Sequence, residues 1–320
     1  MNQFNKNAQL VGLDTELKSQ CERNIDYDLS ALTSRLHAQY GDMISLILLY
    51  GSCLRTNNFT DGVLDFYIIV NNYKDAYKSK FYPLLNELLA PNVFYIEADT
   101  GKEILRAKYA VLSEKDYKKG INEWFHSYIW ARFAQPVRLI YSKNNQAKNL
   151  FYLGLSRSVV RYLNETTPVL GNGRYTTVEL WTNALSLSYA AELRPEPEGR
   201  SKEIVTESME DLQKITNAAL PCLACIRPIQ GSYEFEINCK DADSKKYKRY
   251  WQIRSWQGKL LSILRLIKAT FTFHDCVEYA VWKINRHTGI VIEITPALKK
   301  YPVLLGFKVL WRLLRQKALR

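Results

Sequence analysis

The sequence lacks a long apolar run, and this absence excludes one class of protein. No segment of the 320-residue chain reaches the roughly 18 uninterrupted apolar residues that are read as a membrane-spanning helix. The first residues, MNQFNKNAQLVGLDTELK, contain no apolar signal core, carry acidic residues and have no arginine. We therefore expect neither a secretory signal nor a transit peptide, and by default a cytoplasmic protein.

Cysteine and histidine are also scarce. The six cysteines and four histidines include one C-x-x-C pair, Cys222 and Cys225, but no second pair at zinc-like spacing. This pattern favours reduced, buried thiols over a metal site, and it indicates no catalytic role for any histidine.

Acidic residues are rare in one part of the chain only. From Lys240 to the end there are 18 lysines and arginines against five acidic residues, whereas the whole chain has a net charge of +12. The remainder is therefore close to neutral. A basic C-terminal quarter indicates an anionic partner, either a nucleic acid or an acidic membrane surface.

The apolar pattern changes along the chain from strands to helices. Short β-branched and aromatic runs predict strands over 44–50, 64–70, 92–97, 107–113 and 135–142, with helices over 13–40, 73–90 and 116–133. Helical patterns then follow over 145–164, 177–193, 203–219, 246–269 and 273–287. We expect an α+β protein with an α/β domain over 1–142, a helical domain over 143–300 and a C-terminal helix over 301–320.

One strand carries a carboxylate among apolar residues. The run LLYGSCLRTNNFTDGVLDFYIIV places Gly51-Ser52 at the end of one strand and Asp65 inside the next. A glycine-serine turn lets backbone N–H groups approach a phosphate, and a neighbouring carboxylate could hold Mg²⁺ on that phosphate. This is the layout of the DNA polymerase β-like nucleotidyltransferases. The alternative is a hairpin whose Asp65 faces solvent.

Several further motifs follow in the same order as in a known family. They are Tyr50-Gly51-Ser52, Leu64-Asp65-Phe66, Lys108-Tyr109, Trp124, Arg132, Pro136-Val137 and the stretch LSYAAELR at 187–194. Over roughly residues 45–290 this order resembles the mitochondrial-type phosphatidate cytidylyltransferases, the translocator assembly and maintenance family. The resemblance implies a nucleotidyltransferase-fold mixed sheet and the reaction of CTP with phosphatidic acid to give CDP-diacylglycerol and pyrophosphate.

The sequence also departs from the wider pattern. The superfamily usually has a second acid two residues after the first, where this chain has Tyr67. Alanines stand at two family glycines, Ala110 and Ala131, and Gln135 stands where the family has lysine. Glu192 replaces an aspartate of the LSY motif, which keeps a carboxylate for a metal.

The resemblance implies roles for individual residues. Asp65 and Glu192 are the expected Mg²⁺ ligands, Gly51 and Ser52 would cradle the triphosphate, and Lys108 would act on phosphate oxygens. Arg132, and with it Arg194, would clamp a phosphate with a planar guanidinium. Each has an ordinary alternative: Lys108 could face solvent, Arg132 could be an ion-pair partner near a helix end, and Glu192 and Arg194 could simply close a helix.

The C-terminal stretch PVLLGFKVLWRLLRQKALR has basic residues and no acids. Lys308, Arg312 and Arg315 share one helical stripe beside Trp311 and several leucines. Such a helix suits the plane of an anionic bilayer, and a substrate as apolar as phosphatidic acid stays in that bilayer. Alternatively, the helix packs on the protein core.

These observations predict a Mg²⁺-dependent phosphatidate cytidylyltransferase that is peripheral on the inner face of a membrane. No nucleic-acid partner is expected, because no recognised RNA module is present. Two other functions stay open: nucleotidyl transfer to another acceptor such as RNA or a small molecule, and an inactive nucleotidyltransferase-fold adaptor, which the missing second acid favours.

Overall fold

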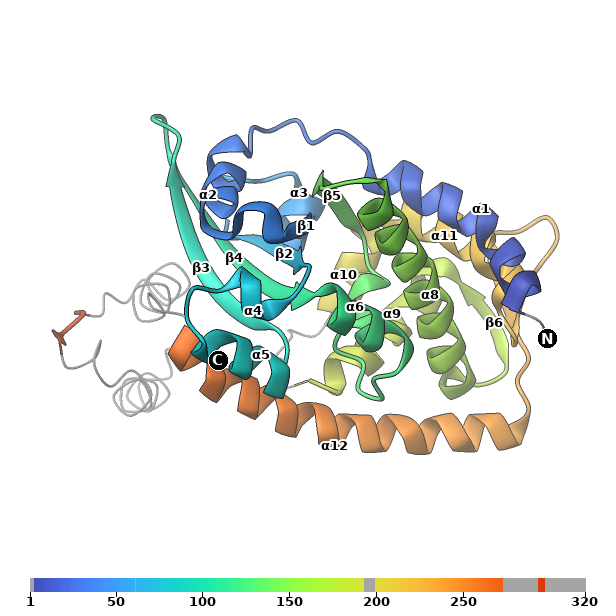
Figure 1. The fold of residues 1–320 in the computed structure, drawn as a ribbon. Helices are drawn as coiled ribbons and strands as arrows, with labels where there is room; N and C mark the ends of the chain where they lie inside the picture. Colours follow the sequence, from blue (N-terminus) through green and yellow to red (C-terminus); the bar gives the residue numbers. More distant parts are fainter. Residues whose placement is uncertain (1–2, 61, 193–198, 273–292, 297–320) are drawn as a thin grey trace.

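The first half of the chain folds around a five-stranded mixed sheet (Figure 1). The computed structural model describes residues 3–60, 62–192, 199–272 and 293–296. Its main strands are β1 (Ile44–Tyr50), β2 (Leu64–Val70), β3 (Asn92–Asp99), β4 (Ile104–Ser113) and β5 (Val137–Ser142), in the order β3-β4-β2-β1-β5. β2 and β4 are parallel, and the other neighbours are antiparallel. All five predicted strands are present, and the predicted α+β class is confirmed.

The central strands are apolar throughout because both of their faces are covered. On β1, Leu46 and Leu48 belong to one buried cluster, whereas Ile47 and Leu49 belong to another. Side chains alternate between the two faces of a strand, so a strand with two covered faces has no polar side. A polar residue inside such a strand therefore marks a place where the covering is interrupted.

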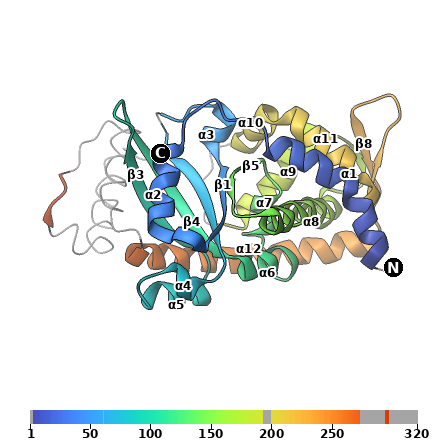
Figure 2. The same cartoon turned by 45° about the horizontal axis from the view of Figure 1, so that its top comes forward.

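Different helices cover the two faces of this sheet (Figure 2). One face packs against α2 (Ser30–Tyr40), α4 (Tyr73–Ala76) and α5 (Phe81–Leu88). The other packs against α1 (Gln3–Cys21), α6 (Glu114–Asn122), α7 (Trp130–Phe133) and the long α8 (Asn145–Leu170). A short α3 (Ser52–Thr56) follows β1. The helices expected over 13–40, 73–90 and 116–133 are thus each divided in two.

The second half is mainly helical but contains a small sheet that the sequence pattern did not predict. Its helices are α9 (Thr177–Ala190), α10 (Arg200–Glu207) and α11 (Met209–Ala219), so the single helix expected over 203–219 is interrupted at Ser208. The sheet has the order β6 (Gly173–Thr176), β8 (Glu234–Ile237), β7 (Ile226–Pro228). Strands of three or four residues are too short for alternation to distinguish them from loops.

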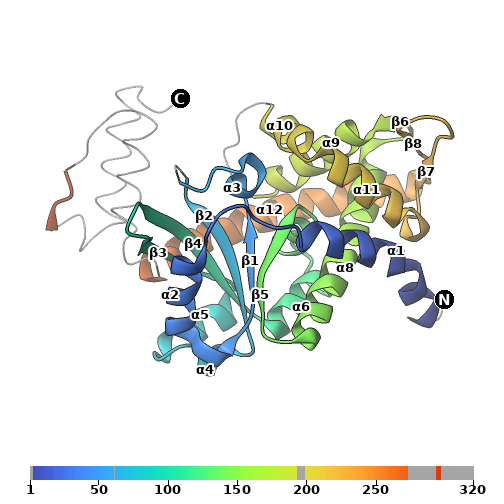
Figure 3. The same ribbon diagram turned by 90° about the horizontal axis from the view of Figure 1, so that it is seen from above.

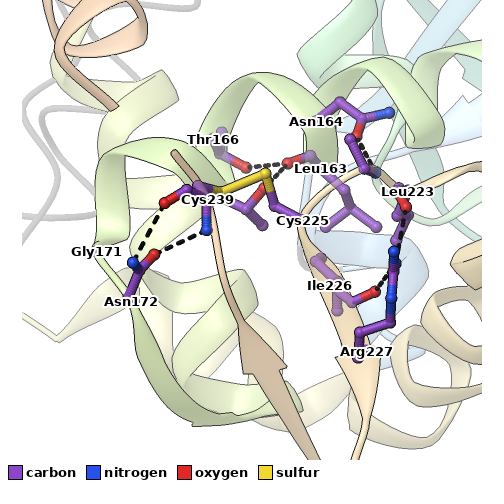
Figure 4. The surroundings of a disulfide bond; sticks show 12 residues. Leu163, Asn164, Thr166, Gly171, Asn172, Leu223, Cys225, Ile226, Arg227 and Cys239 are labelled. Carbon is purple, nitrogen blue, oxygen red and sulfur yellow. Dashed lines mark hydrogen bonds between the residues drawn. A yellow bond between two sulfur atoms is a disulfide. The ribbon is translucent and has the colours of Figure 1, made fainter. Parts of the chain in front are cut away.

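A disulfide closes the β7–β8 hairpin, which corrects the prediction that the thiols are reduced. Cys225 is bonded to Cys239, not to its C-x-x-C neighbour Cys222 (Figure 4). The side chain of Asn172 fixes the same end of the hairpin, since it accepts from the Cys239 N–H at 2.8 Å and donates to the Cys239 carbonyl at 3.2 Å. Cys21 and Cys53 are buried free thiols.

The hairpin leads into α12 (Asp241–Thr272), which passes both halves of the molecule (Figures 1 and 3). The helix approaches the end of α9 so closely that a Cβ on Gly258 would lie 2.0 Å from the Ala191 carbonyl oxygen. Farther along, Thr272 donates to the Val93 carbonyl of β3. No helix within the described ranges is long and apolar enough to cross a membrane.

Three predictions concern residues outside the described ranges. These are the helix over 273–287, the C-terminal helix over 301–320 with Lys308, Trp311, Arg312 and Arg315, and the phosphate-binding role of Arg194.

Candidate functional site

The end of β1 brings the backbone against the carboxylate of Asp65. Gly51 has φ of +92°, a conformation that favours glycine, and a Cβ at this position would lie 2.5 Å from Asp65 Oδ2. Ser52 follows as the first residue of α3, with its side chain exposed. A larger residue than glycine would therefore distort the backbone and push Asp65 out of place.

The sheet register places Asp65 beside Lys108. Asp65 pairs with Tyr50 on β1 and with Lys108 on the parallel strand β4. Lys108 Nζ lies 3.0 Å from Asp65 Oδ1, and the two side chains are 33% and 19% exposed. Asp65 therefore does not simply face solvent, as in the hairpin alternative. It lies on a central strand and forms an ion pair with Lys108.

These residues open into a cavity of about 440 Å³ between the sheet and the helices. Its lining includes four cations but a single acid, Asp65; the cations are Arg55, Lys108, Arg132 and Arg200. Arg55 and Arg200 also contact Glu207 and Glu203. An excess of positive charge in a concave site favours a polyanion such as a triphosphate.

Arg132 reaches the cavity from α7 and forms an ion pair with Glu192. Its Nη2 lies 3.5 Å from Glu192 Oε2, with both side chains about one-fifth exposed or less. The guanidinium stacks over the rings of Tyr128 and Tyr50, at 5.0 and 5.7 Å from their centroids. The structure thus brings together two predicted site residues, Arg132 and Glu192. They were predicted to bind a phosphate and a metal ion, whereas here they form an ion pair with each other.

A second arginine, which the sequence did not single out, reaches the same ring from α12. The guanidinium of Arg265 lies 3.8 Å from the centroid of Tyr128, on whose ring Arg132 also stacks. Burial lowers the pKa of Arg265, and the nearby Tyr128 and Glu192 act against that shift. In the sequence Arg265 is one of many basic residues of α12, and only its packing distinguishes it.

Three nitrogen atoms of this arginine pair are buried without a hydrogen-bond partner within the described structure. They are Arg132 Nε, Arg265 Nε and Arg265 Nη2. Buried donors are nearly always paired in folded proteins, so a cluster of unpaired donors indicates a site for an acceptor from outside the chain. The planar fork of a guanidinium matches the oxygens of a phosphate.

Tyr67 occupies the strand position where the superfamily has its second acid. Its ring is buried against those of Tyr50 and Phe133, with both centroids at 4.9 Å. Burial raises the pKa of Tyr67 well above its usual value, and its hydroxyl has no hydrogen-bond partner among the described residues. The strand therefore offers a neutral hydroxyl at this position in place of a second carboxylate.

The described residues contain no group of three acidic, histidine or cysteine side chains that could hold a metal alone. Asp65 nevertheless fits a divalent cation, because its carboxylate faces a polar cavity next to a backbone turn where no Cβ could be accommodated. Mg²⁺ often binds through one or two carboxylates, with substrate phosphates and waters as the other ligands.

Comparison with known proteins agrees with this geometry. Residues 44–257 match the family described as phosphatidate cytidylyltransferase, mitochondrial. No curated protein matches the chain. The matched region includes Gly51, Asp65, Lys108, Arg132 and Glu192, whereas Arg265 lies beyond it.

Proposed function

Because the chain belongs to the mitochondrial phosphatidate cytidylyltransferase family, a family of nucleotidyltransferases, we propose that the cavity around Asp65 carries out this transfer. A phosphate oxygen of phosphatidic acid would attack the α-phosphorus of CTP. The bond from that phosphorus to the bridging oxygen would break, which gives CDP-diacylglycerol and pyrophosphate. The observation that carries the proposal is the contact of Asp65 with the Gly51 turn and with Lys108.

The nucleotide would lie on the sheet side of the cavity. Backbone N–H groups at the Gly51-Ser52 turn and the ammonium of Lys108 are suited to the triphosphate oxygens. Asp65 would hold Mg²⁺, which when bound neutralises charge that develops on the leaving pyrophosphate. The nucleophile is already an anion near neutral pH, so the chain must position phosphates and needs no strong general base.

The phosphate of phosphatidic acid would lie on the helical side, between Arg132 and Arg265. Their unpaired nitrogens would donate to the phosphate monoester, and stacking on Tyr128 holds both planes in place. Such a clamp orients the attacking oxygen and removes water from it, which is how positioning accelerates phosphoryl transfer.

Glu192 has two proposed roles. Its ion pair with Arg132 suits it to orient that guanidinium, and its role as a second metal ligand stays a prediction. The variant Glu192→Gln distinguishes them. A loss that is reversed by raised Mg²⁺ supports a ligand, whereas an increased KM for phosphatidate at any Mg²⁺ concentration supports the positioning role.

We further propose that the enzyme works on the anionic surface of a membrane. It would be a peripheral protein on the inner face of that membrane. Phosphatidic acid stays in the bilayer, so the protein must come to it. The predicted basic helix with Lys308, Trp311, Arg312 and Arg315 would contribute to this contact, although it lies outside the described residues.

The test is to incubate the protein with Mg²⁺, α-labelled CTP and vesicles that contain phosphatidate, and to extract the lipid. We expect lipid-bound label with CTP and much less with ATP. Asp65→Asn should lower kcat by at least about a hundredfold, because a lost metal ligand removes several kcal/mol of charge stabilisation. Label transferred to RNA instead of lipid would support another acceptor, and no transfer at all would support the inactive adaptor.

A further inference from the structure

The helix α12 buries several charged side chains and exposes several large apolar ones. The residues that it turns toward the protein include Arg254, which is 2% exposed, and Lys268, which is 7% exposed. Arg265 projects from the same side of the helix, eleven positions after Arg254 and three before Lys268. A surface helix normally buries its apolar side chains and exposes its charges.

The opposite face of α12 exposes large apolar side chains. They are Ile253, Trp256, Leu260, Ile263, Leu264, Leu266, Ile267 and Phe271, and their exposed fractions range from 44% to 72%. At 100° per residue each of these positions lies about 80° or more around the helix from both Arg254 and Arg265. Single exposed apolar residues are common, but eight on one helix form a continuous patch that indicates an interaction surface.

The neighbouring helix α5 extends this patch. Phe81, Leu84 and Leu88 follow one another at helical spacing and are 47%, 52% and 73% exposed. The rings of Phe81 and Phe271 meet edge to face, with their centroids 6.3 Å apart, and Figure 1 shows α5 against the last turns of α12. Lys268 fastens the two elements together, because it donates to the Leu89 carbonyl and, at 2.7 Å, to the Pro91 carbonyl.

The charge around the patch has one sign. From Ser244 to Thr272 the sequence has eight lysines and arginines and no acidic residue. Five of these cations are exposed, namely Lys245, Lys246, Lys248, Arg249 and Lys259. An exposed apolar face with basic flanks is the composition of a helix that lies in the interface of an anionic bilayer.

We propose that the outward face of α12, together with α5, is the surface by which this protein docks on an anionic lipid bilayer. This inference rests on the proposed function and adds the place of contact. The apolar side chains would enter the interface, and the flanking lysines would meet lipid phosphates. Arg265, on the inward side of the same helix, then lies between the bilayer and the cavity, where a phosphatidate headgroup would arrive.

The test compares a double variant, Trp256→Glu with Leu264→Glu, with the matched control Met209→Glu. Met209 is also an exposed apolar residue, 46% exposed, but it lies on α11. With phosphatidylcholine vesicles that contain phosphatidate, we expect the vesicle-bound fraction of the double variant to fall at least about tenfold. The control should bind like the unaltered protein, and high salt should weaken binding of both.

Activity separates this inference from the proposed function. The double variant should act normally on phosphatidate dispersed in detergent and poorly on phosphatidate in vesicles. If the unaltered protein transfers no nucleotide to either form, the proposed function fails. The vesicle-binding result would still decide whether α12 docks on lipid.

Three results would overturn the inference. The first is unchanged vesicle binding by the double variant. The second is a large fall in its melting temperature, which would show that the protein itself covers this face. The third is conversion of a dimer to a monomer, which would assign the face to a second copy of the chain.

A second measurement needs no disruptive substitution. Brominated lipids quench tryptophans that enter the bilayer interface, and the side chain of Trp256 is 72% exposed. We expect the unaltered protein to lose more fluorescence on brominated vesicles than Trp256→Phe does. Equal losses from the two proteins would contradict the inference.

Discussion

The molecule contains two clusters that each combine two arginines, one glutamate and one aromatic ring but differ in hydrogen bonding. In the first, Arg161 and Arg254 contact the ring of Trp130, with their guanidinium carbons 4.8 and 5.3 Å from its centroid. In the second, Arg132 and Arg265 contact the ring of Tyr128, at 5.0 and 3.8 Å. Each cluster has one glutamate, Glu165 or Glu192, and each takes one of its arginines from α12.

The first cluster uses nearly all of its donors within the protein. Arg161 donates to the carbonyls of Ile121 and Trp124 and lies 3.6 Å from Glu165 Oε1. Arg254 donates to the Phe125 carbonyl at 2.8 Å and lies 2.6 Å from Glu165 Oε2, which leaves only its Nη1 unpaired within the described structure. These contacts fasten α12 to α8 and to the segment before α7.

The second cluster leaves three nitrogens unpaired and has a longer ion pair, 3.5 Å between Arg132 and Glu192. An unpaired buried donor costs about 1–3 kcal/mol, so the second cluster is a less stable arrangement than the first. The difference teaches that the residue types in a cluster do not distinguish structural from functional arginines. The number of guanidinium donors that stay unpaired, and so can bind a ligand, distinguishes them.

The largest expected effect comes from breaking the first cluster. Arg254→Met leaves the partly buried Glu165 with only its longer contact to Arg161, at 3.6 Å, and we expect the free energy of unfolding to fall by about 3–5 kcal/mol. Arg265→Met removes a guanidinium with two unpaired nitrogens, so it should change stability much less. Urea unfolding of both variants measures the two values, and a larger loss for Arg265→Met would reverse our assignment.

The disulfide is expected to contribute next, on the structural side of the comparison. It closes a loop with a sequence separation of 14 just before α12 begins. Chain-entropy arguments give about 3 kcal/mol for such a loop. Cys239→Ser should lower the free energy of unfolding by about this amount, whereas the control Cys222→Ser, at the other cysteine of the C-x-x-C pair, should lower it much less. Similar values for both would show that the disulfide does not form in solution.

The smallest effect, taken per unit of pH, is a pH dependence from Lys268, the neighbour of Arg265 on α12. Burial, and then the charge of Arg265, lower the pKa of Lys268 from 10.5 to about 7. Between these two values the unfolded chain binds more protons than the folded chain. The free energy of unfolding should therefore rise with pH above about 7, by at most about 1.4 kcal/mol per unit.

The matched variant for this effect is Lys268→Met, which removes the titrating group. Its stability should show a weaker increase between pH 7 and 10 than that of the unaltered protein. Identical slopes would show that Lys268 keeps its proton throughout this range. Comparison of slopes, and not of absolute stabilities, removes the contribution of the lost hydrogen bonds to the α5–β3 segment.

The sequence predicts the sheet well because its signal is strong and local. β1 and β2 have the predicted bounds, since each is a continuous apolar run that ends at a turn. Asp65 and Gly51 could be found for the same reason, because a carboxylate in a buried strand and a glycine at its neighbour's end stand out from their surroundings.

Other features depend on packing between distant segments. The partner of Cys225 is set by the β7–β8 register, which the spacing of cysteines does not reveal. Arg254 and Arg265 are three helical turns apart in the same basic run, and nothing local separates them. Their different roles follow from which glutamate, ring and carbonyls each one meets.

The most direct test of the account is binding of a short-chain, water-soluble phosphatidate, measured by calorimetry on three proteins: unaltered, Arg265→Met and Arg254→Met. Our assignment predicts that Arg265→Met weakens binding by about tenfold or more, since a hydrogen bond to a charged group contributes about 1.5–3 kcal/mol. Arg254→Met, measured below its lowered unfolding transition, should bind like the unaltered protein. Normal affinity in Arg265→Met would contradict the account, because its unpaired nitrogens would then not be a phosphate site.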